Sequence, residues 1–297
     1  MKKKLLKISI VLLFIVGVAG YILTIHVAPY AIIQPQKIHL DITPKQLGLQ
    51  SEQLNITTKD SILLKGYQIK PKMKPVAVMI LIHGIGGCKE HFLNLAGKLT
   101  NYGIASVLFD GRAHGESGGQ YCTYGFYEKQ DISAIVDEIK KRNPTLKIGI
   151  WGNSLGGAIA IQALEFDKRI QFGIIESTFT ELNQIVYDYK KKMLGGFGLR
   201  FISDAALSEA GKIANFNPDE VKPIRSVQNI QQPILFAHGN QDENINYTYG
   251  KALYENAASA EKEFVLVEGA GHFNVGEKGG SAYQEKWLHF ILEQSKK

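Results

Sequence analysis

The chain has 297 residues, of which 45% are hydrophobic and 21% charged, as in a globular protein that buries a sizeable core in one large domain or two modest ones. Its formal net charge is +6, but four lysines lie within residues 1–7, and the rest of the chain has 30 basic residues against 28 acidic ones. The other compact basic run, Lys190–Lys192, is typical of a solvated face. Without a zinc-finger spacing or an aromatic-rich basic motif, the sequence predicts no nucleic-acid partner.

The N-terminal segment carries a targeting signal. After the first lysines, Ile8–Ile25 is apolar apart from one serine and one threonine, and its eighteen residues approach the length that spans a bilayer. A signal-peptide core is usually shorter, although Gly17 and Ala19 could serve as a cleavage site. We therefore predict that residues 1–33 form a signal anchor with one transmembrane helix; the alternatives are secretion after cleavage, and a buried helix. The lysines favour the cytoplasm, which places the rest of the chain outside it.

Residues 34–297 are predicted to form one α/β domain, entered through a linker at residues 34–50. Runs of apolar and β-branched residues predict strands at 51–57, 63–69, 76–82, 105–109, 147–151, 172–175, 234–237 and 264–267. Helical patterns lie between them at 91–100, 127–141, 155–165, 249–258 and 281–293. The first two strands are expected to be antiparallel, and the alternation of the others predicts a mostly parallel central sheet with helices on both faces.

One stretch breaks this alternation. Residues 180–232 contain no strand pattern and are predicted to form a small helical insertion between two strands. Insertions at the carboxyl edge of an open sheet lie over the crevice where ligands bind. We expect this one to form a lid, or cap, that sets the size of the substrate.

The pattern Gly-x-Ser-x-Gly occurs twice. The copy around Ser117 follows a loop and leads into no helix, so we interpret it as a coincidence. The copy around Ser154 follows a predicted strand and leads directly into a predicted helix, which is the strand–turn–helix of a nucleophile elbow. The flanking Gly152 and Gly156 allow close approach of neighbouring backbone around a strained serine. Ser154 is therefore the predicted nucleophile.

A serine nucleophile requires a base, and the base requires an orienting acid. Asp242 comes just after one predicted strand, and His272 lies in the loop after the next, so both belong to the same sheet edge as Ser154. Serine, acid and histidine also occur in the order typical of a nucleophile-elbow fold. The sequence predicts His272 as the base and Asp242 as the acid, with Glu243 as the rival acid.

An oxyanion hole requires two backbone N–H groups. One comes from the residue after the nucleophile, Leu155, and the other from the loop after an earlier strand. That loop is Gly-rich at residues 83–87, and we nominate the N–H of Ile85 as the second donor. His83 precedes this donor and is interpreted as structural. The glycine spacing fits neither of the common phosphate-binding loops.

Taken together, these motifs resemble the α/β-hydrolase superfamily from about residue 51 to the end of the chain. The blocks that carry the resemblance are His83-Gly84, Asp110-Gly-Arg-Ala-His-Gly-Glu-Ser117, Gly152-Asn-Ser-Leu-Gly156, His238-Gly-Asn-Gln-Asp242 and Gly271-His272. Esterases, lipases and prolyl-oligopeptidase-type peptidases share such blocks. The segment Ile213–Pro223 and the anchor are similar to the membrane-anchored BEM46-like branch. Where the family usually has glycine in the second block, this chain has Ala113.

The resemblance implies a serine esterase or lipase that acts on a small-molecule acyl substrate through an acyl-serine intermediate, without a metal ion or an organic cofactor. A serine peptidase of prolyl-oligopeptidase-like type is the alternative, although no propeller domain is present to select peptides. A non-catalytic ligand-binding homologue is the third interpretation, against which the complete triad argues.

The two cysteines, Cys88 and Cys122, follow neighbouring predicted strands at the same sheet edge. Outside the cytoplasm two nearby thiols can form a bridge, so a disulfide at the mouth of the site is one hypothesis. Two free thiols in the core are the other.

Overall fold

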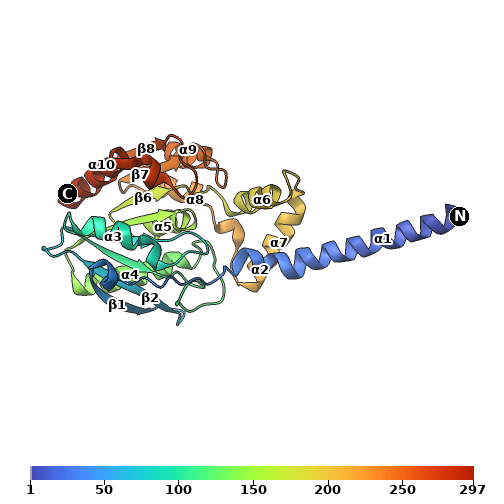
Figure 1. Cartoon of the computed structure of the whole chain (residues 1–297), viewed down its shortest axis with the longest axis horizontal. Helices are drawn as coiled ribbons and strands as arrows, with labels where there is room; N and C mark the ends of the chain where they lie inside the picture. Colours follow the sequence, from blue (N-terminus) through green and yellow to red (C-terminus); the bar gives the residue numbers. More distant parts are fainter. Residues whose placement is uncertain (1) are drawn as a thin grey trace.

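The computed structural model describes residues 2–297 and contains an eight-stranded sheet (Figure 1). The strand order is β1-β2-β4-β3-β5-β6-β7-β8. All pairs from β4 onward along this order are parallel, whereas β2 pairs antiparallel with both β1 and β4, as expected for β1 and β2. The strands are β1 (Gln50–Thr57), β2 (Leu63–Lys70), β3 (Ala77–Ile82), β4 (Ile104–Phe109), β5 (Lys147–Asn153), β6 (Phe172–Glu176), β7 (Ile234–Gly239) and β8 (Lys262–Val267).

Helices cover both faces of the sheet, which confirms the predicted architecture. One core cluster joins the sheet to α4, α5 and α9, and a second joins its other face to α3 and α10. Strands β3, β4 and β7 are buried along their whole length, which explains their continuous apolar runs. These helices are α3 (Leu93–Thr100), which follows the turn η3 (Lys89–Phe92), α4 (Glu128–Arg142), α5 (Leu155–Phe166), α9 (Tyr247–Asn256) and α10 (Val275–Lys296). Helix α10 begins before the predicted residue 281 because a shorter helical segment precedes a break at Gly280 (φ 55°).

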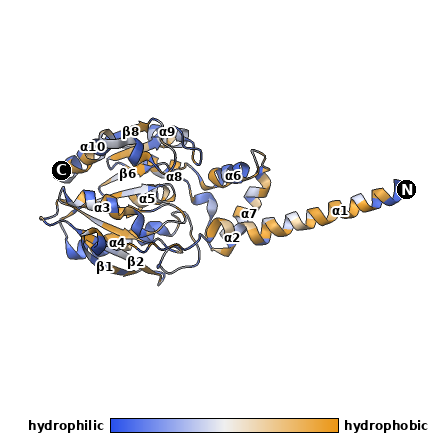
Figure 2. Cartoon of the chain, in the orientation of Figure 1, coloured by the Kyte–Doolittle hydropathy of each residue, from blue (hydrophilic) through white to orange (hydrophobic). Residues whose placement is uncertain are grey.

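The apolar N-terminal segment is one helical run that leaves the domain. It comprises α1 (Lys2–Ile22), the π-helical turn η1 (Leu23–Val27) and α2 (Ala28–Ile33). Lys2–Ile33 is long and apolar enough to cross a membrane, and no residue of α1 is buried. Figure 2 shows α1, coloured mostly as hydrophobic, projecting away from the rest of the molecule. The helix continues beyond the predicted apolar limit at Ile25 because its last turns pack against the domain.

The end of this helical run is fixed to the domain. Ile33 is fully buried, and its carbonyl accepts the N–H of Cys122 at 2.7 Å. The Tyr124 hydroxyl donates to the Ile32 carbonyl at 2.6 Å. In the predicted linker that follows, Lys37 donates to the Ser117 carbonyl at 2.6 Å, and η2 (Pro44–Leu47) forms a capped turn. The exposed helix and the folded domain are therefore joined by ordered contacts.

The strandless insertion is helical, as predicted. Between β6 and β7, all of which the structure describes, it contains α6 (Leu182–Met193), α7 (Arg200–Ile213), η4 (Pro218–Glu220), α8 (Pro223–Ser226) and η5 (Val227–Asn229). Helices α6 and α7 pack on each other, and α7 also packs against α2 and η1. In Figure 1 this pair lies on the side of the domain from which α1 emerges.

The disulfide hypothesis is wrong. Cys88 and Cys122 are both free and buried. Cys122 belongs to the core cluster beneath α4 and α5, where its backbone also bonds to Ile33. Burial raises the pKa of the Cys88 thiol to about 12 and that of Cys122 well above its ordinary value. Both thiols are therefore protonated core side chains.

Candidate active site

Ser154 lies on a strained turn between β5 and α5. Its φ of 54° and ψ of −121° are unfavourable for a residue with a side chain. The turn closes only because glycines flank it: a Cβ on Gly152 would lie 2.1 Å from the Gly156 carbonyl oxygen, and one on Gly156 would lie 2.1 Å from the Ile82 carbonyl oxygen. The strain presents the serine side chain at the carboxyl edge of the sheet.

The structure brings Ser154, His272 and Asp242 together. The Nε2 of His272 lies 2.9 Å from the Ser154 Oγ, and its Nδ1 lies 2.7 Å from the Asp242 Oδ2. The three residues follow the carboxyl ends of β5, β7 and β8. Ser154 and His272 are 118 residues apart in the sequence. Such a chain of hydrogen bonds orients an imidazole to accept the proton of a serine hydroxyl.

The carboxylate of Asp242 is held by several donors. Its Oδ1 accepts the N–H groups of Asn244 at 2.9 Å and Ile245 at 2.8 Å. Burial alone would raise the pKa of Asp242, but the hydrogen bonds from His238, His272 and the Ile245 N–H outweigh burial and hold that pKa well below its ordinary value. Asp242 therefore stays ionised opposite His272.

His238 is a site residue to which the sequence analysis assigned no role. It is fully buried in β7, and its Nε2 lies 3.2 Å from the Asp242 Oδ2 and 2.8 Å from the Ile245 carbonyl oxygen. Gly250 of α9 makes room for this ring, because a Cβ there would lie 2.5 Å from the His238 Nδ1. The sequence signal for this role was the four-residue spacing in His238-Gly-Asn-Gln-Asp242. The turn between the two residues brings the histidine ring next to the Asp242 carboxylate.

The rival residues have other partners. Ser117 is buried, donates to the Asp110 carbonyl at 2.6 Å and accepts the Lys65 N–H at 2.9 Å, so its hydroxyl joins two backbone segments. The Glu243 carbonyl accepts a hydrogen bond from Lys192, and it is Asp242 rather than Glu243 that contacts His272. Ala113 in the same loop as Ser117 has a φ of 63°, which accounts for glycine being usual there.

One nominated oxyanion donor, Leu155, directly follows Ser154, and the other, Ile85, directly follows Gly84. Leu155 is the first residue of α5, so its N–H has no acceptor within the helix. Among the turn, loop and cap hydrogen bonds of residues 2–297, none is donated by the N–H of Leu155 or of Ile85. The adjoining Gly84 is close enough that a Cβ there would lie 3.3 Å from the Ser154 Cβ. The N–H of Leu155 is thus free next to the serine, and that of Ile85 is free in the loop whose Gly84 lies close to Ser154.

His83 supports the Gly-rich loop. Its Nδ1 lies 2.8 Å from the Gly84 carbonyl oxygen, and its Nε2 accepts the Gly111 N–H at 3.0 Å. Burial, followed by the neighbouring His114, lowers the pKa of His83 to about 4. A neutral ring matches this arrangement, with the proton on Nδ1 and a lone pair on Nε2. His83 thus joins the loop that carries Ile85 to the loop that follows β4.

A buried lysine supports the same two loops. The Lys89 Nζ lies 2.8 Å from the Asp110 Oδ2, 2.6 Å from the Glu116 Oε2 and 2.9 Å from the Glu90 Oε1. Burial alone would lower the pKa of Lys89, but the hydrogen bonds to these carboxylates outweigh it and raise that pKa. His39 approaches Glu90 and Glu116 closely enough for a metal-ligand set, but the ammonium group already lies among the carboxylates. We interpret the cluster as structural.

Helix α6 of the insertion contacts the loop that carries Asp242. The Lys192 Nζ donates to the Glu243 carbonyl at 3.0 Å and to the Asn244 Oδ1 at 2.9 Å. On the same helix, burial and the charge of Asp242 raise the pKa of Tyr189. The insertion therefore lies at the same sheet edge as Ser154.

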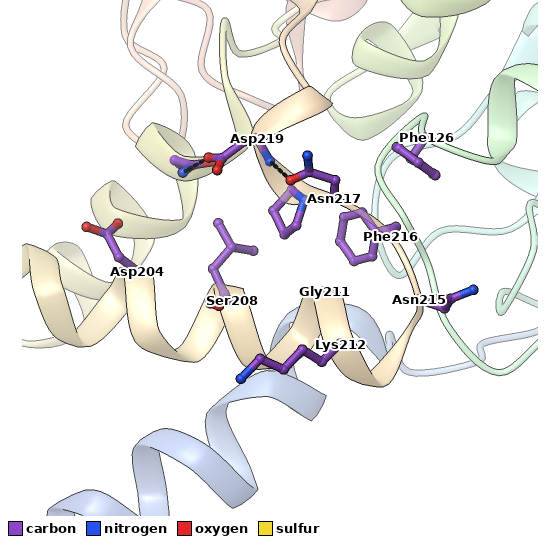
Figure 3. Close-up of a pocket in the computed structure, with 12 residues that line it drawn as sticks. Phe126, Asp204, Ser208, Gly211, Lys212, Asn215, Phe216, Asn217 and Asp219 are labelled. Carbon is purple, nitrogen blue, oxygen red and sulfur yellow. Dashed lines mark hydrogen bonds between the residues drawn. The ribbon is translucent and has the colours of Figure 1, made fainter.

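A groove of about 670 Å³ lies between α7 and the segment that follows it, and Phe126 also lines it. Figure 3 shows Phe216, Asn217 and Asp219 on the segment that lies above α7, while Lys212 runs along the opposite side of that helix. None of its lining residues is Ser154, Asp242 or His272. The groove is thus separate from the triad.

The mostly parallel sheet, the elbow and the helical insertion define a protein of the α/β-hydrolase fold. The chain belongs to the family described as serine aminopeptidase, S33, which matches residues 73–225, just over half of its length. Among solved structures, the esterase Pf2001 of Pyrococcus furiosus has the same fold, with a TM-score of 0.71 and 24% identity over 89% of this chain and 97% of the esterase.

Two curated relatives point to the predicted branch. Protein bem46 of Schizosaccharomyces pombe is 25% identical over 75% of this chain and 71% of its own length. The lysophosphatidylserine lipase ABHD12 of Macaca fascicularis is 28% identical over 73% of this chain, and the match spans 55% of ABHD12. The predicted resemblance to BEM46-like α/β-hydrolases is confirmed.

Proposed function

We propose that this protein is a serine hydrolase that cleaves carboxylic esters through an acyl-Ser154 intermediate. The observation that carries the proposal is the hydrogen-bonded series Ser154–His272–Asp242 on a strained elbow. His272 accepts the Ser154 proton as the hydroxyl attacks the ester carbonyl, and then delivers it to the leaving alcohol. A water molecule, deprotonated by His272, releases the acid and regenerates Ser154.

Other backbone and side-chain groups assist this reaction. Ionised Asp242 holds the His272 Nδ1–H and stabilises the imidazolium that forms. The N–H groups of Ile85 and Leu155 bind the oxyanion of the tetrahedral intermediate, where charge develops. None of these steps requires a metal ion or an organic cofactor.

For the substrate we propose an ester that carries one acyl chain and is drawn from a membrane. The esterase and lysophosphatidylserine lipase among the similar proteins support an ester, and the apolar helix supports a membrane location. Residues 1–33 form the anchor, residues 34–297 the hydrolase domain, and residues 180–232 a lid that limits substrate size. The lysines at the start of the chain favour the cytoplasmic side, which supports a domain outside the cytoplasm.

The test combines labelling with a substrate series. The full chain in detergent micelles is expected to react with a fluorophosphonate probe at Ser154, and the Ser154→Ala variant is expected to lose this label. A series of p-nitrophenyl esters of increasing chain length then measures the acyl preference, alongside aminoacyl and peptidyl amides. A folded wild-type chain that reacts with neither probe nor ester would contradict the proposal, and faster cleavage of the amides would identify a peptidase.

A further inference from the structure

The connection between α6 and α7 exposes an unusual number of apolar side chains. We call residues 193–201 the hairpin tip. Its exposed apolar residues are Met193 (85% exposed), Leu194, Phe197 (67%), Leu199 and Phe201 (69%). Gly195 and Gly196 have positive φ values of 64° and 94°, with no atom within 4 Å of where a Cβ would lie, so the turn is open on its outer side. Large apolar groups clustered in this way indicate a contact surface.

Basic residues flank the same segment. Residues 189–203 contain three lysines and an arginine but no acidic residue. Lys191 is exposed, and Arg200 stacks over the Tyr187 ring with its guanidinium carbon 4.6 Å from the ring centroid. An apolar face bordered by basic side chains is the arrangement of segments that lie in the interface of an anionic bilayer.

The position of the hairpin identifies the bilayer concerned. Helix α7, which begins within the tip, packs against α2 and η1, the last turns of the apolar N-terminal run. These turns are fixed to the domain by the contacts at Ile32 and Ile33. Figures 1 and 2 show that the hairpin and the hydrophobic α1 lie on the same side of the domain. A membrane crossed by α1 therefore lies beside the hairpin.

We propose that the hairpin tip docks into the interfacial region of the anionic phospholipid bilayer that α1 spans. Its apolar side chains enter the boundary between headgroups and acyl chains, and Lys190, Lys191 and Arg200 bind anionic headgroups. Because α6 contacts the loop that carries Asp242, docking holds the mouth of the site against the membrane. The proposal rests on α1 as a membrane span and is independent of the catalytic roles assigned above.

The test places a fluorophore in the tip of the full chain. Phe197→Trp is reconstituted at one chain per lipid nanodisc, with phosphatidylcholine and phosphatidylglycerol brominated near the carbonyl end of the acyl chains. The two native tryptophans, Trp151 and Trp287, are buried in the core and give a constant background. Phe166→Trp is the matched control, because Phe166 is also exposed but lies at the far end of α5, about 18 Å from Ser154 along the helix.

Brominated lipid is expected to reduce the added emission of Phe197→Trp at least about twofold, as for a side chain at the acyl boundary, and to leave that of Phe166→Trp unchanged. Equal quenching of the two variants would overturn the proposal. So would unquenched emission from Phe197→Trp. If Phe197→Trp does not fold, Met193→Cys labelled with a dye that brominated lipid quenches replaces it. The label attaches to this cysteine because Cys88 and Cys122 are buried.

The headgroup contribution has its own comparison. Omitting phosphatidylglycerol, or changing Lys190→Gln and Lys191→Gln together, is expected to reduce the quenching of the Phe197→Trp variant. Quenching that is independent of both changes would overturn the assignment of an anionic bilayer.

Discussion

The sheet edge that carries Ser154, Asp242 and His272, here called the triad edge, and the hairpin tip are built in opposite ways. At the triad edge, Asp242 and His238 are buried and hydrogen-bonded. At the tip, Met193 and Phe201 are largely exposed, on either side of a glycine turn. Changes at the edge should therefore alter chemistry and stability, whereas changes at the tip should alter only what the protein contacts.

The largest expected effect comes from the nucleophile. Ser154→Ala should lower the rate of ester hydrolysis by at least about three orders of magnitude, because no other hydroxyl is bonded to His272 within residues 2–297. The rate is measured on the full chain with a p-nitrophenyl ester, and the circular dichroism spectrum should be unchanged.

Ser117→Ala is the matched control, since it alters the same sequence pattern. It should retain activity per folded molecule but lower the free energy of unfolding by about 1–3 kcal/mol, because the Lys65 N–H and the Asp110 carbonyl lose a buried partner. Activity lost in Ser117→Ala and kept in Ser154→Ala would reverse the assignment.

The next effect concerns the buried lysine that supports the edge. Lys89→Met should lower the free energy of unfolding by about 3–5 kcal/mol, because Asp110 is left as a buried charge without its cation. Chemical denaturation of the detergent-solubilised chain measures the difference. Lys191→Met, at an exposed lysine next to the hairpin tip, should change the free energy of unfolding by less than about 0.5 kcal/mol. Similar losses in the two variants would show that the lysines at the triad edge and beside the hairpin tip contribute equally to stability.

His238 should act on the reaction through Asp242. His238→Ala is expected to lower kcat about tenfold or more by removing a hydrogen bond to the acid, worth about 1.5 kcal/mol or more when the acceptor is charged. His238→Gln keeps an N–H near the position of Nε2 and should restore part of the loss. If both variants lose the same activity, packing of the ring rather than its hydrogen bond is what matters.

The same residue should change the acid stability. Because the folded-state pKa of Asp242 is lowered, its ionised form stabilises the fold above the unfolded-state pKa of about 4, and this contribution is lost as the pH falls toward the folded-state value. His238→Ala raises the pKa of Asp242, so the loss should be complete at a higher pH. Unfolding curves between neutral and acid pH test this, and parallel curves for wild type and variant would refute it.

The smallest effect is expected at the tip. Phe197→Ser and Phe201→Ser should each change the free energy of unfolding in detergent by less than about 0.5 kcal/mol, since these side chains are mostly exposed. Hydrolysis of a short water-soluble ester should also be unchanged. A loss above about 1 kcal/mol would mean that the tip packs against the domain and is not free to enter a bilayer.

Local patterns in the sequence were sufficient for much of the fold and for the candidate triad. Continuous apolar runs predicted the buried strands, and the strand–turn–helix around Ser154 distinguished it from Ser117. Ser154, Asp242 and His272 each follow a predicted parallel strand. Their positions predicted that the three side chains lie close together, because the carboxyl ends of parallel strands share one sheet edge. The catalytic roles of the triad, and of the Ile85 and Leu155 N–H groups, remain predictions for the experiments above.

The sequence by itself thus determined the strand pattern, the elbow and the apolar N-terminal helix, since periodicity and glycine placement act within a few residues of the chain. The tertiary structure alone decided that His238 supports Asp242, that Cys88 and Cys122 stay apart as buried thiols, and that α7 packs against the end of the apolar helix. These contacts join segments distant in sequence, and their geometry depends on how helices pack on the sheet. No local pattern encodes that packing, because each contact is selected by the shape and burial of the whole core.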